Sequence, residues 1–211
     1  MSEFNFNYDI YGESPTKPEK IIQDRAIKRK IKNEEIHLKK ANQLSQLCTI
    51  PLPNEQWRII TEKQFNAYAL IKTMIEKGNI DELYLAIYRI NEQTVNAIIE
   101  MIDEGKIKKA TFIISNFFNQ TKKPEAWARK LRGYCETSDN CKHAYVHNHS
   151  KIVCVKSNDN YYVFEGSGNM SDNARIEQYI YENNNLIYEF HKKWMDELII
   201  VSQKNPSRIA Y

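Results

Sequence analysis

Two patterns of hydrophobic positions alternate along the middle of the chain, one typical of buried strands and the other of amphipathic helices. Residues 83–90 (LYLAIYRI) and 110–115 (ATFIIS) are short apolar runs that suit strands buried on both faces. Between them, four apolar residues recur at helical spacing: Val95, Ile98, Ile99 and Ile102. Asn91, just before these residues, favours the start of a helix. Strand, helix and strand in this order predict a parallel βαβ unit with a right-handed crossover.

Three more helices are predicted from apolar residues at helical spacing. The first ends before Gly78 and begins with a capping-box pattern formed by Thr61 and Gln64. The second starts at about Pro124, and the third runs through Trp194 near the end of the chain. Helices therefore alternate with strands over most of the sequence, which is typical of an α/β domain.

Four shorter strands are predicted between the second and third of these helices: residues 143–148, 151–156, 161–166 and 174–180. Residues 157–160 favour a hairpin turn between the middle two strands. That hairpin would bring His149 and Lys151 close to the turn at residues 166–169. We therefore expect an α/β fold in which a mixed β-sheet is flanked by helices.

The N-terminal quarter of the chain differs from the rest. Residues 1–16 have no helical period, whereas residues 19–44 place cations between apolar residues, as in a basic amphipathic helix. Two prolines then break the chain. The sequence thus predicts a tail and basic helical arm over residues 1–56, followed by a compact domain over residues 57–211.

The charge of the chain is concentrated in this arm. The formal net charge is +3, but residues 17–40 alone hold nine Lys or Arg against four Asp or Glu. Lys28, Arg29, Lys30 and Lys32 form the densest part of this basic segment. Such a run is either a solvated helix face or an arm that neutralises the phosphates of DNA, and the sequence leaves both readings open.

Cysteine usage and hydropathy indicate the compartment. Cys48, Cys135, Cys141 and Cys154 include no C-x-x-C pair and no dense framework, which favours a reducing interior. The start of the chain, MSEFNFNYDI, does not resemble a signal peptide, and no apolar run approaches the roughly 18 to 20 residues of a membrane span. We therefore expect a cytoplasmic protein that does not engage a membrane.

A zinc site is one alternative use of the histidines. His143 and His147 follow Cys135 and Cys141 closely in the sequence. Their spacing is not a standard zinc-ligand pattern, so no metal is predicted.

Five side chains in three short segments form a set suited to a tetrahedral phosphate: His149, Lys151, Ser167, Asn169 and Glu177. The lysine offers a point cation, the serine and asparagine offer neutral donors, and the imidazole offers a nucleophilic nitrogen. Glu177, on the following strand, would accept a hydrogen bond from the other ring nitrogen of His149 and so define its tautomer. We expect these five residues to be catalytic.

Three neighbouring residues are expected to bind the substrate. Gly166 and Gly168 would let the backbone approach an anion closely. In a strand, His147 would share one face with His149 and Lys151, so it would line the same cleft.

These segments resemble the signature of the phospholipase D superfamily, H-x-K followed by G-S-x-N and a later Glu. Here the pattern reads HSK at residues 149–151, GSGN at residues 166–169, and then Glu177, and the likeness extends over residues 61–211. The full family pattern has an Asp five residues after the Lys, where this chain has Lys156. In that respect the chain is similar to the metal-independent nuclease branch, in which this Asp is often missing.

The resemblance implies a phospholipase D-like fold and phosphodiester hydrolysis without a metal or other cofactor. The family's chemistry uses two histidines facing one phosphate, and this chain carries one copy of the motif, so a homodimer is expected. His149 of one subunit would attack phosphorus to form a phosphohistidine, while its symmetry mate protonates the leaving oxygen. Lys151 and Asn169 of both subunits would neutralise the non-bridging oxygens.

Three functions fit these features. The first is an endonuclease that acts on DNA, or alternatively on RNA. The second is a catalytically inactive DNA-binding or interaction protein on the same scaffold. The third is a phospholipid-processing enzyme, which would be expected to bring a membrane-binding surface or two copies of the motif.

Overall fold

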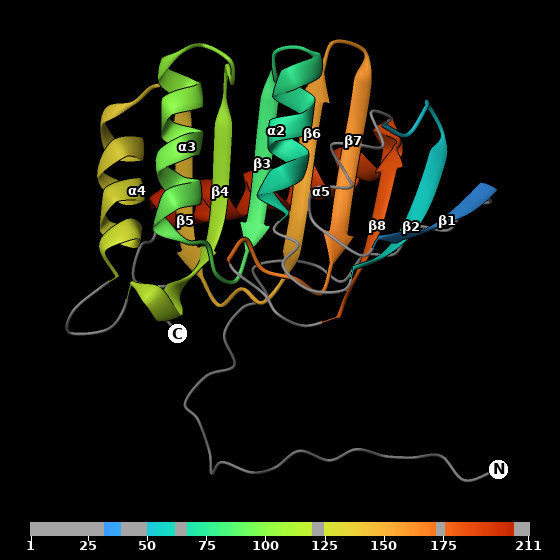
Figure 1. The fold of residues 1–211 in the computed structure, drawn as a ribbon. Coiled ribbons are helices and arrows are strands. Elements are labelled where there is room, and N and C mark those ends of the chain that lie inside the picture. The colour runs from blue at the N-terminus through green and yellow to red at the C-terminus, as the bar shows by residue number, and fades with distance from the viewer. Residues whose placement is uncertain (1–31, 39–49, 62–66, 120–124, 172–175, 205–211) are drawn as a thin grey trace, which may run out of the picture.

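The computed structural model describes residues 32–38, 50–61, 67–119, 125–171 and 176–204, with the backbone alone described for 32–38. Within these ranges one eight-stranded sheet has the order β1-β2-β8-β7-β6-β3-β4-β5 (Figure 1). The strands are β1 Lys32–Leu38, β2 Glu55–Thr61, β3 Glu82–Ile87, β4 Ala110–Ser115, β5 Cys141–Val146, β6 Lys151–Ser157, β7 Asn160–Gly166 and β8 Glu177–Asn183.

Parallel and antiparallel pairs occur in the same sheet. β3 pairs in parallel with β4, β4 with β5, and β1 with β2. β6 pairs antiparallel with both β3 and β7, and β8 pairs antiparallel with both β7 and β2. The expected α/β fold with a mixed sheet is therefore confirmed.

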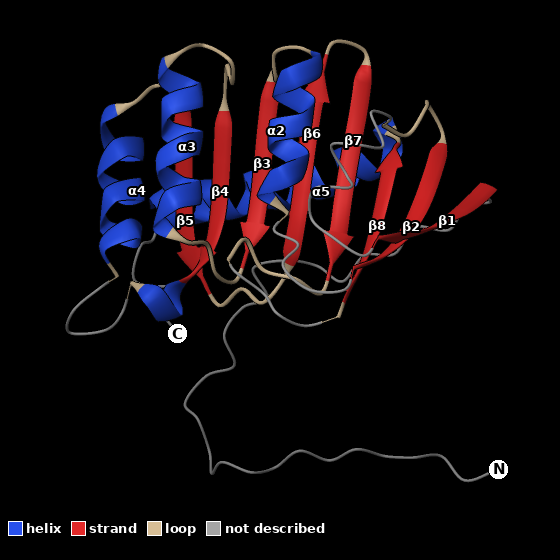
Figure 2. Cartoon of the chain, in the orientation of Figure 1, coloured by secondary structure: helices blue, strands red, loops and turns tan. Residues whose placement is uncertain are grey.

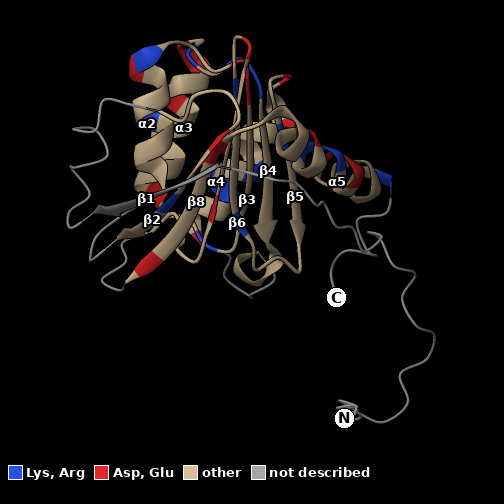
Figure 3. Cartoon of the chain, turned by 90° about the vertical axis from the view of Figure 1, so that its right-hand side faces the viewer, with Lys and Arg blue, Asp and Glu red and all other residues tan. Residues whose placement is uncertain are grey.

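Helices cover both faces of this sheet (Figures 1 and 2). α2 (Tyr68–Lys77), α3 (Glu92–Asp103) and α4 (Ala126–Thr137) lie on one face, and α5 (Asn185–Lys204) crosses the other. Figure 3 shows this sandwich from the side, with α2 and α3 on one side of the strands and α5, which carries both acidic and basic residues, on the other. Each face has its own buried apolar cluster. None of the helices in the described ranges has the length and apolar character needed to cross a bilayer.

The βαβ unit predicted for residues 83–115 is confirmed. β3 and β4 are buried along almost their whole length, and α3 connects them. Asn91 caps α3 as expected, because its Oδ1 accepts a hydrogen bond from the backbone N–H of Thr94 at 2.8 Å.

The hairpin between β6 and β7 is confirmed as well. Asn158 in its turn has a φ of 51°, a left-handed conformation that asparagine tolerates better than most residues.

The predicted helical arm is wrong over Lys32–Leu38, which forms strand β1. β1 pairs in parallel with β2 along its whole length, from Lys32 opposite Glu55 to Leu38 opposite Thr61. The open edge of β2 offers a row of backbone donors and acceptors, and pairing with it outweighs a weak helical propensity. Lys28, Arg29 and Lys30 lie outside the described residues. The division into two domains at residue 56 stays a prediction, although β1 and β2 belong to one sheet.

The expected capping box before α2 is also wrong. Thr61 is the last residue of β2, where it pairs with Glu177 of β8 and its Oγ1 donates to the Glu177 carbonyl oxygen at 3.4 Å. α2 begins at Tyr68, and its N-cap residue, Ala67, has no side chain able to cap it. Gln64 lies outside the described residues. The Thr61 hydroxyl, which was expected to cap a helix, therefore bonds to the neighbouring strand instead.

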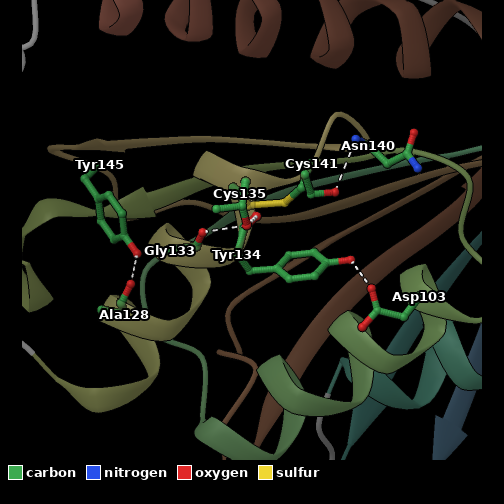
Figure 4. The surroundings of a disulfide bond; sticks show 10 residues. Asp103, Ala128, Gly133, Tyr134, Cys135, Asn140, Cys141 and Tyr145 are labelled. Atoms are coloured by element: carbon green, nitrogen blue, oxygen red, sulfur yellow. Dashed lines mark hydrogen bonds between the residues drawn. A yellow bond between two sulfur atoms is a disulfide. The ribbon is translucent and has the colours of Figure 1, made fainter.

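A disulfide joins Cys135, near the end of α4, to Cys141, the first residue of β5 (Figure 4). The sequence spacing did not indicate this pair. Two tyrosines support the same corner: Tyr134 Oη donates to Asp103 at 2.7 Å, and Tyr145 Oη donates to the Ala128 carbonyl oxygen at 2.6 Å. The expectation of a reducing, cytoplasmic compartment stays a prediction.

Candidate functional site

Four strand ends meet at one edge of the sheet, the lower edge in Figure 1. β3 and β7 run toward this edge and β6 and β8 start from it, because neighbouring members of this group are antiparallel. Lys151 is the first residue of β6, Gly166 the last of β7 and Glu177 the first of β8. Residues that are far apart in the sequence motif therefore come to the same edge.

The HNHSK segment is a loop up to Ser150, and the strand expected to carry His147 and His149 on one face is wrong there. The side chain of Asn148 holds this loop. Its Nδ2 donates to the carbonyl oxygen of Ile113 at 2.8 Å, and its Oδ1 accepts from the backbone N–H of Ser150 at 2.9 Å. The second of these bonds is local and competes with strand pairing, as bonds from asparagine side chains often do. His147 is exposed, and its contact with a substrate stays a prediction.

His149 and Lys151 form the centre of the site. Lys151 Nζ lies 3.1 Å from His149 Nδ1 and 2.6 Å from the carbonyl oxygen of His149. Because an ammonium has only donors, Nδ1 is the acceptor and the neutral ring carries its proton on Nε2. Partial burial lowers the pKa of Lys151, and the negative charge of Glu177 opposes that shift.

Tyr88, directly after β3, contacts both of these residues. Its ring centroid lies 4.7 Å from that of His149, with the rings tilted by 52°. Lys151 Nζ lies 5.4 Å from the same Tyr88 centroid, within the range of a cation–π contact. Sequence reasoning missed Tyr88. The available signal was its place after a buried strand of the βαβ unit, since ligands commonly bind at the carboxyl ends of such strands.

Ser167 and Glu177 bind each other across the β7–β8 pair. Ser167 Oγ donates to the Glu177 carboxylate and accepts the backbone N–H of Gln178 at 3.1 Å. The Ser167 N–H donates to the Gln178 carbonyl oxygen at 3.0 Å, so the register of the pair continues past the end of β7. Glu177 is buried. The expected hydrogen bond between Glu177 and His149 stays a prediction.

Asn169 is tied to the end of β3. Its Oδ1 accepts the backbone N–H of Arg89 at 3.3 Å. The next residue, Met170, exchanges backbone hydrogen bonds with the same segment, donating to Arg89 at 3.1 Å and accepting from Asn91 at 3.0 Å. With Oδ1 engaged, the Nδ2 group of Asn169 is the donor that this side chain would offer to an anion.

Gly166 and Gly168 pack against Tyr179 of β8. A Cβ at Gly166 would lie 2.1 Å from Tyr179 Cδ1 and 2.5 Å from the Gln178 carbonyl oxygen. A Cβ at Gly168 would lie 1.9 Å from Tyr179 Oη. Both positions therefore need glycine so that the loop can lie flat on the tyrosine ring. The contact of their backbone with a bound anion stays a prediction.

Lys156, where the family pattern has Asp, lies at the other end of β6 from Lys151. Five residues of extended strand separate the two by roughly 16 Å. Lys156 pairs in register with Glu82 of β3, and its Nζ lies 5.8 Å from the Tyr161 ring centroid. The departure from the family pattern therefore lies away from the edge where His149 and Lys151 meet.

The described residues contain no cluster of three or more His, Cys, Asp or Glu side chains placed to hold a metal ion. The zinc alternative relied on Cys135 and Cys141, which are bonded to each other. His143, in the middle of β5, is partly buried, and burial lowers the pKa of its imidazole.

No protein-family model and no curated protein matches the chain. It is similar in structure to TrmBL2, an archaeal chromatin protein described as showing a novel mode of DNA binding (14% identity, 68% of this chain and 52% of that chain, TM-score 0.45). It is also similar to phosphatidylserine synthase from Haemophilus influenzae Rd KW20 (17% identity, 69% of this chain and 39% of that chain, TM-score 0.48). A third similar structure is polyphosphate kinase from Porphyromonas gingivalis (11% identity, 66% of this chain and 25% of that chain, TM-score 0.46). The chain spans between 25% and 52% of the length of these proteins.

Proposed function

We propose that this protein is a phosphodiesterase of the phospholipase D superfamily that cleaves nucleic acid through a phosphohistidine. The observation that carries the proposal is the meeting of an imidazole, an ammonium and an amide around the end of β3. The ring of His149 and the ammonium of Lys151 contact Tyr88, and the amide of Asn169 contacts the next residue, Arg89. A nucleophile, a cation and a neutral donor that contact two successive residues after β3 suit a phosphodiester.

Binding of the phosphodiester would rearrange the contact between His149 and Lys151. A phosphate oxygen attracts an ammonium more strongly than a neutral imidazole nitrogen does, so Lys151 would move from Nδ1 to a non-bridging oxygen. The proton of the ring would then reside on Nδ1, with the Glu177 carboxylate as its acceptor, and Nε2 would carry the lone pair. Asn169 Nδ2 would donate to the other non-bridging oxygen.

In the first chemical step, His149 Nε2 forms a bond to phosphorus while the bond from phosphorus to the leaving oxygen breaks. The leaving oxygen takes a proton from a second imidazolium, which becomes a neutral base. In the second step, that base removes a proton from water, the water oxygen bonds to phosphorus, and the nitrogen–phosphorus bond breaks. The products are a phosphomonoester and a hydroxyl group, and no metal ion takes part.

The second imidazole would come from a second copy of the chain. One copy of the chain supplies one imidazole here, because His149 contacts Lys151 and Tyr88 within the described residues. A twofold axis through the site would bring two such imidazoles to opposite sides of one phosphate. We therefore propose a homodimeric active site.

Nucleic acid is the proposed substrate because the basicity of the chain is concentrated near its N-terminus. The excess of Lys and Arg over residues 17–40 suits the repeated phosphates of a strand. A single lipid headgroup presents no such repeated charge. DNA is the preferred substrate of the proposal, and RNA is tested beside it.

The direct test is cleavage of labelled DNA and RNA in excess EDTA. The wild-type protein is expected to cleave, and His149→Ala to lose cleavage by at least about 10³-fold, since general acid–base and nucleophilic roles are both removed. His143→Ala, which removes a histidine from the middle of β5, is the matched control and is expected to cleave like the wild type. Binding without cleavage by the wild type would favour the inactive DNA-binding alternative. Hydrolysis of liposomes but not of nucleic acid would favour the phospholipid alternative.

A further inference from the structure

Phe117 is a large aromatic side chain left in solvent beside the proposed phosphate site. It belongs to the short 3-10 helix η1 (Asn116–Phe118), which directly follows β4. Its side chain is 59% exposed, whereas its neighbour Phe118 is 6% exposed. Phe118 packs on Trp127 of α4, with ring centroids 5.4 Å apart, and so anchors η1 to the core. Anchoring by one phenylalanine thus holds the other at the surface.

The exposed ring continues a row of rings that starts at His149. The ring centroid of Tyr88 lies 4.7 Å from that of His149. On the Phe117 side, the centroids of Tyr88 and Phe117 are 6.5 Å apart. Tyr88 and Phe117 are inclined by only 29°, so their faces are nearly aligned. Tyr88 also meets Phe118 edge to face at 5.3 Å, which restrains its position. An aromatic surface therefore leads from the proposed nucleophile into solvent.

A cation lies beside this surface. Arg89 is exposed, and its guanidinium carbon lies 5.9 Å from the Phe118 ring centroid. The backbone N–H of Arg89 binds Asn169 Oδ1, so the same residue connects the aromatic row with the proposed anion site. Rings flanked by cations are the usual means of binding single-stranded nucleic acid, because bases stack on the rings and phosphates pair with the cations.

We propose that Tyr88 and Phe117 form a stacking surface for the nucleobase next to the scissile phosphate, and that the preferred substrate is therefore an unpaired strand. This inference rests on the proposed function and names its substrate class. In a duplex each base face is covered by the neighbouring base pair, so a base can stack on Phe117 only after leaving the duplex stack. An unpaired base reaches the ring without that cost.

The test compares binding of one labelled oligonucleotide as a single strand, as a duplex, and as a strand of equal charge in which all bases are absent. Binding is measured by fluorescence anisotropy in the His149→Ala background, so that the strands stay intact. Phe117→Ala is expected to weaken binding of the single strand by about tenfold, while binding of the duplex and of the baseless strand stays unchanged. Phe117→Trp is expected to restore binding of the single strand.

Leu186→Ala is the matched control, since Leu186 is a 57% exposed apolar residue at the start of α5 and belongs to neither site. An equal loss on all three ligands, or no loss with Phe117→Ala, would overturn the stacking surface. Cleavage by the wild type is scored separately in the presence of EDTA. Cleavage that depends on His149 but not on Phe117 rejects the stacking surface alone, whereas base-dependent binding without any cleavage rejects the proposed catalysis alone.

Discussion

Lys151 Nζ lies 3.1 Å from Nδ1 of His149, the residue two positions before it. In the proposed mechanism, this contact would hold His149 and Lys151 in a state that is not yet ready for attack, because the donor of Lys151 would keep the ring proton on Nε2. Phosphate would release the ring by drawing the ammonium away. The same event that binds the substrate would therefore activate the nucleophile.

The first prediction concerns the charge of Lys151. Burial lowers the pKa of this lysine from its ordinary 10.5, and Glu177 limits the shift. Glu177→Gln is therefore expected to lower the pKa of Lys151 further, so that the ammonium loses its proton at a lower pH. NMR titration of carbon-labelled lysine side chains measures this directly. Glu104→Gln, which removes the partner of Lys106 at the end of α3, is the control and is expected to leave the Lys151 titration unchanged. A Lys151 pKa at or above 10.5 in the wild type would contradict this reading.

The second prediction concerns the shared site. If each active site needs His149 from two subunits, exchange of wild-type subunits with His149→Ala subunits makes inactive mixed dimers. At constant total protein, cleavage is then expected to fall as the square of the wild-type fraction. A fall in direct proportion to that fraction would show that each chain acts alone. Native mass spectrometry of a mixture in which one kind of subunit is isotope-labelled confirms that mixed dimers have formed.

The third prediction concerns Gly168. A Cβ at this position would collide with Tyr179 Oη, so Gly168→Ala is expected to lower the free energy of unfolding by about 1–3 kcal/mol. Gly133 in α4 has no atom within 4 Å of such a Cβ, so Gly133→Ala is expected to be neutral or stabilising by up to about 1 kcal/mol. Urea unfolding followed by circular dichroism compares the two. Equal effects of the two substitutions would refute the packing explanation.

The fourth prediction concerns acid stability. Burial acts to raise the pKa of Glu82, but the hydrogen bond and the positive charge of Lys192, together with a hydrogen bond from Tyr188, outweigh it and hold the pKa below its usual 4.5. Because the folded pKa lies below the unfolded one, Glu82 contributes stability above about pH 4.5 that is lost as the pH falls through the folded pKa. The Glu82→Gln variant is expected to be less stable at neutral pH, by about 1 kcal/mol or less after solvent screening.

That difference between Glu82→Gln and the wild type should shrink as the pH falls below 4.5. Glu189→Gln, on the exposed side of α5, is the control for the general effect of removing a carboxylate. A difference that stays constant between neutral and acidic pH would contradict the assignment.

Part of the sheet was predictable because β3 and β4 are largely apolar runs and because β6 and β7 are joined by a clear turn. β4 has the bounds that its apolar run predicted, and Asn91 and Asn158 mark a helix start and a hairpin turn by side-chain chemistry that acts locally. Prediction failed for segments whose secondary structure depends on pairing with strands that are distant in the sequence. β1 forms through an edge offered by β2, and Thr61 pairs with β8 instead of capping α2.

The candidate site was predictable only as a set of residues. The motif identified His149 and Asn169, but their support by Tyr88 and Arg89 depends on where β3 ends relative to β6 and β7. Phe117 can stack on a nucleobase only because its side chain is exposed. The sequence does not indicate which of the two adjacent residues, Phe117 or Phe118, is exposed and which is buried. Strand order is set by pairing between distant segments, which a single sequence leaves open.

Trapping of the covalent intermediate is the sharpest test of the proposed phosphohistidine at His149. The protein is mixed with a phosphorus-labelled oligonucleotide, quenched in alkali to preserve phosphoramidate bonds, and digested for mass spectrometry. We expect a nucleotidyl group on the peptide that carries His149, formed in excess EDTA and missing in His149→Ala. Cleavage of the oligonucleotide with no modified histidine, or with the label on another residue, would contradict it.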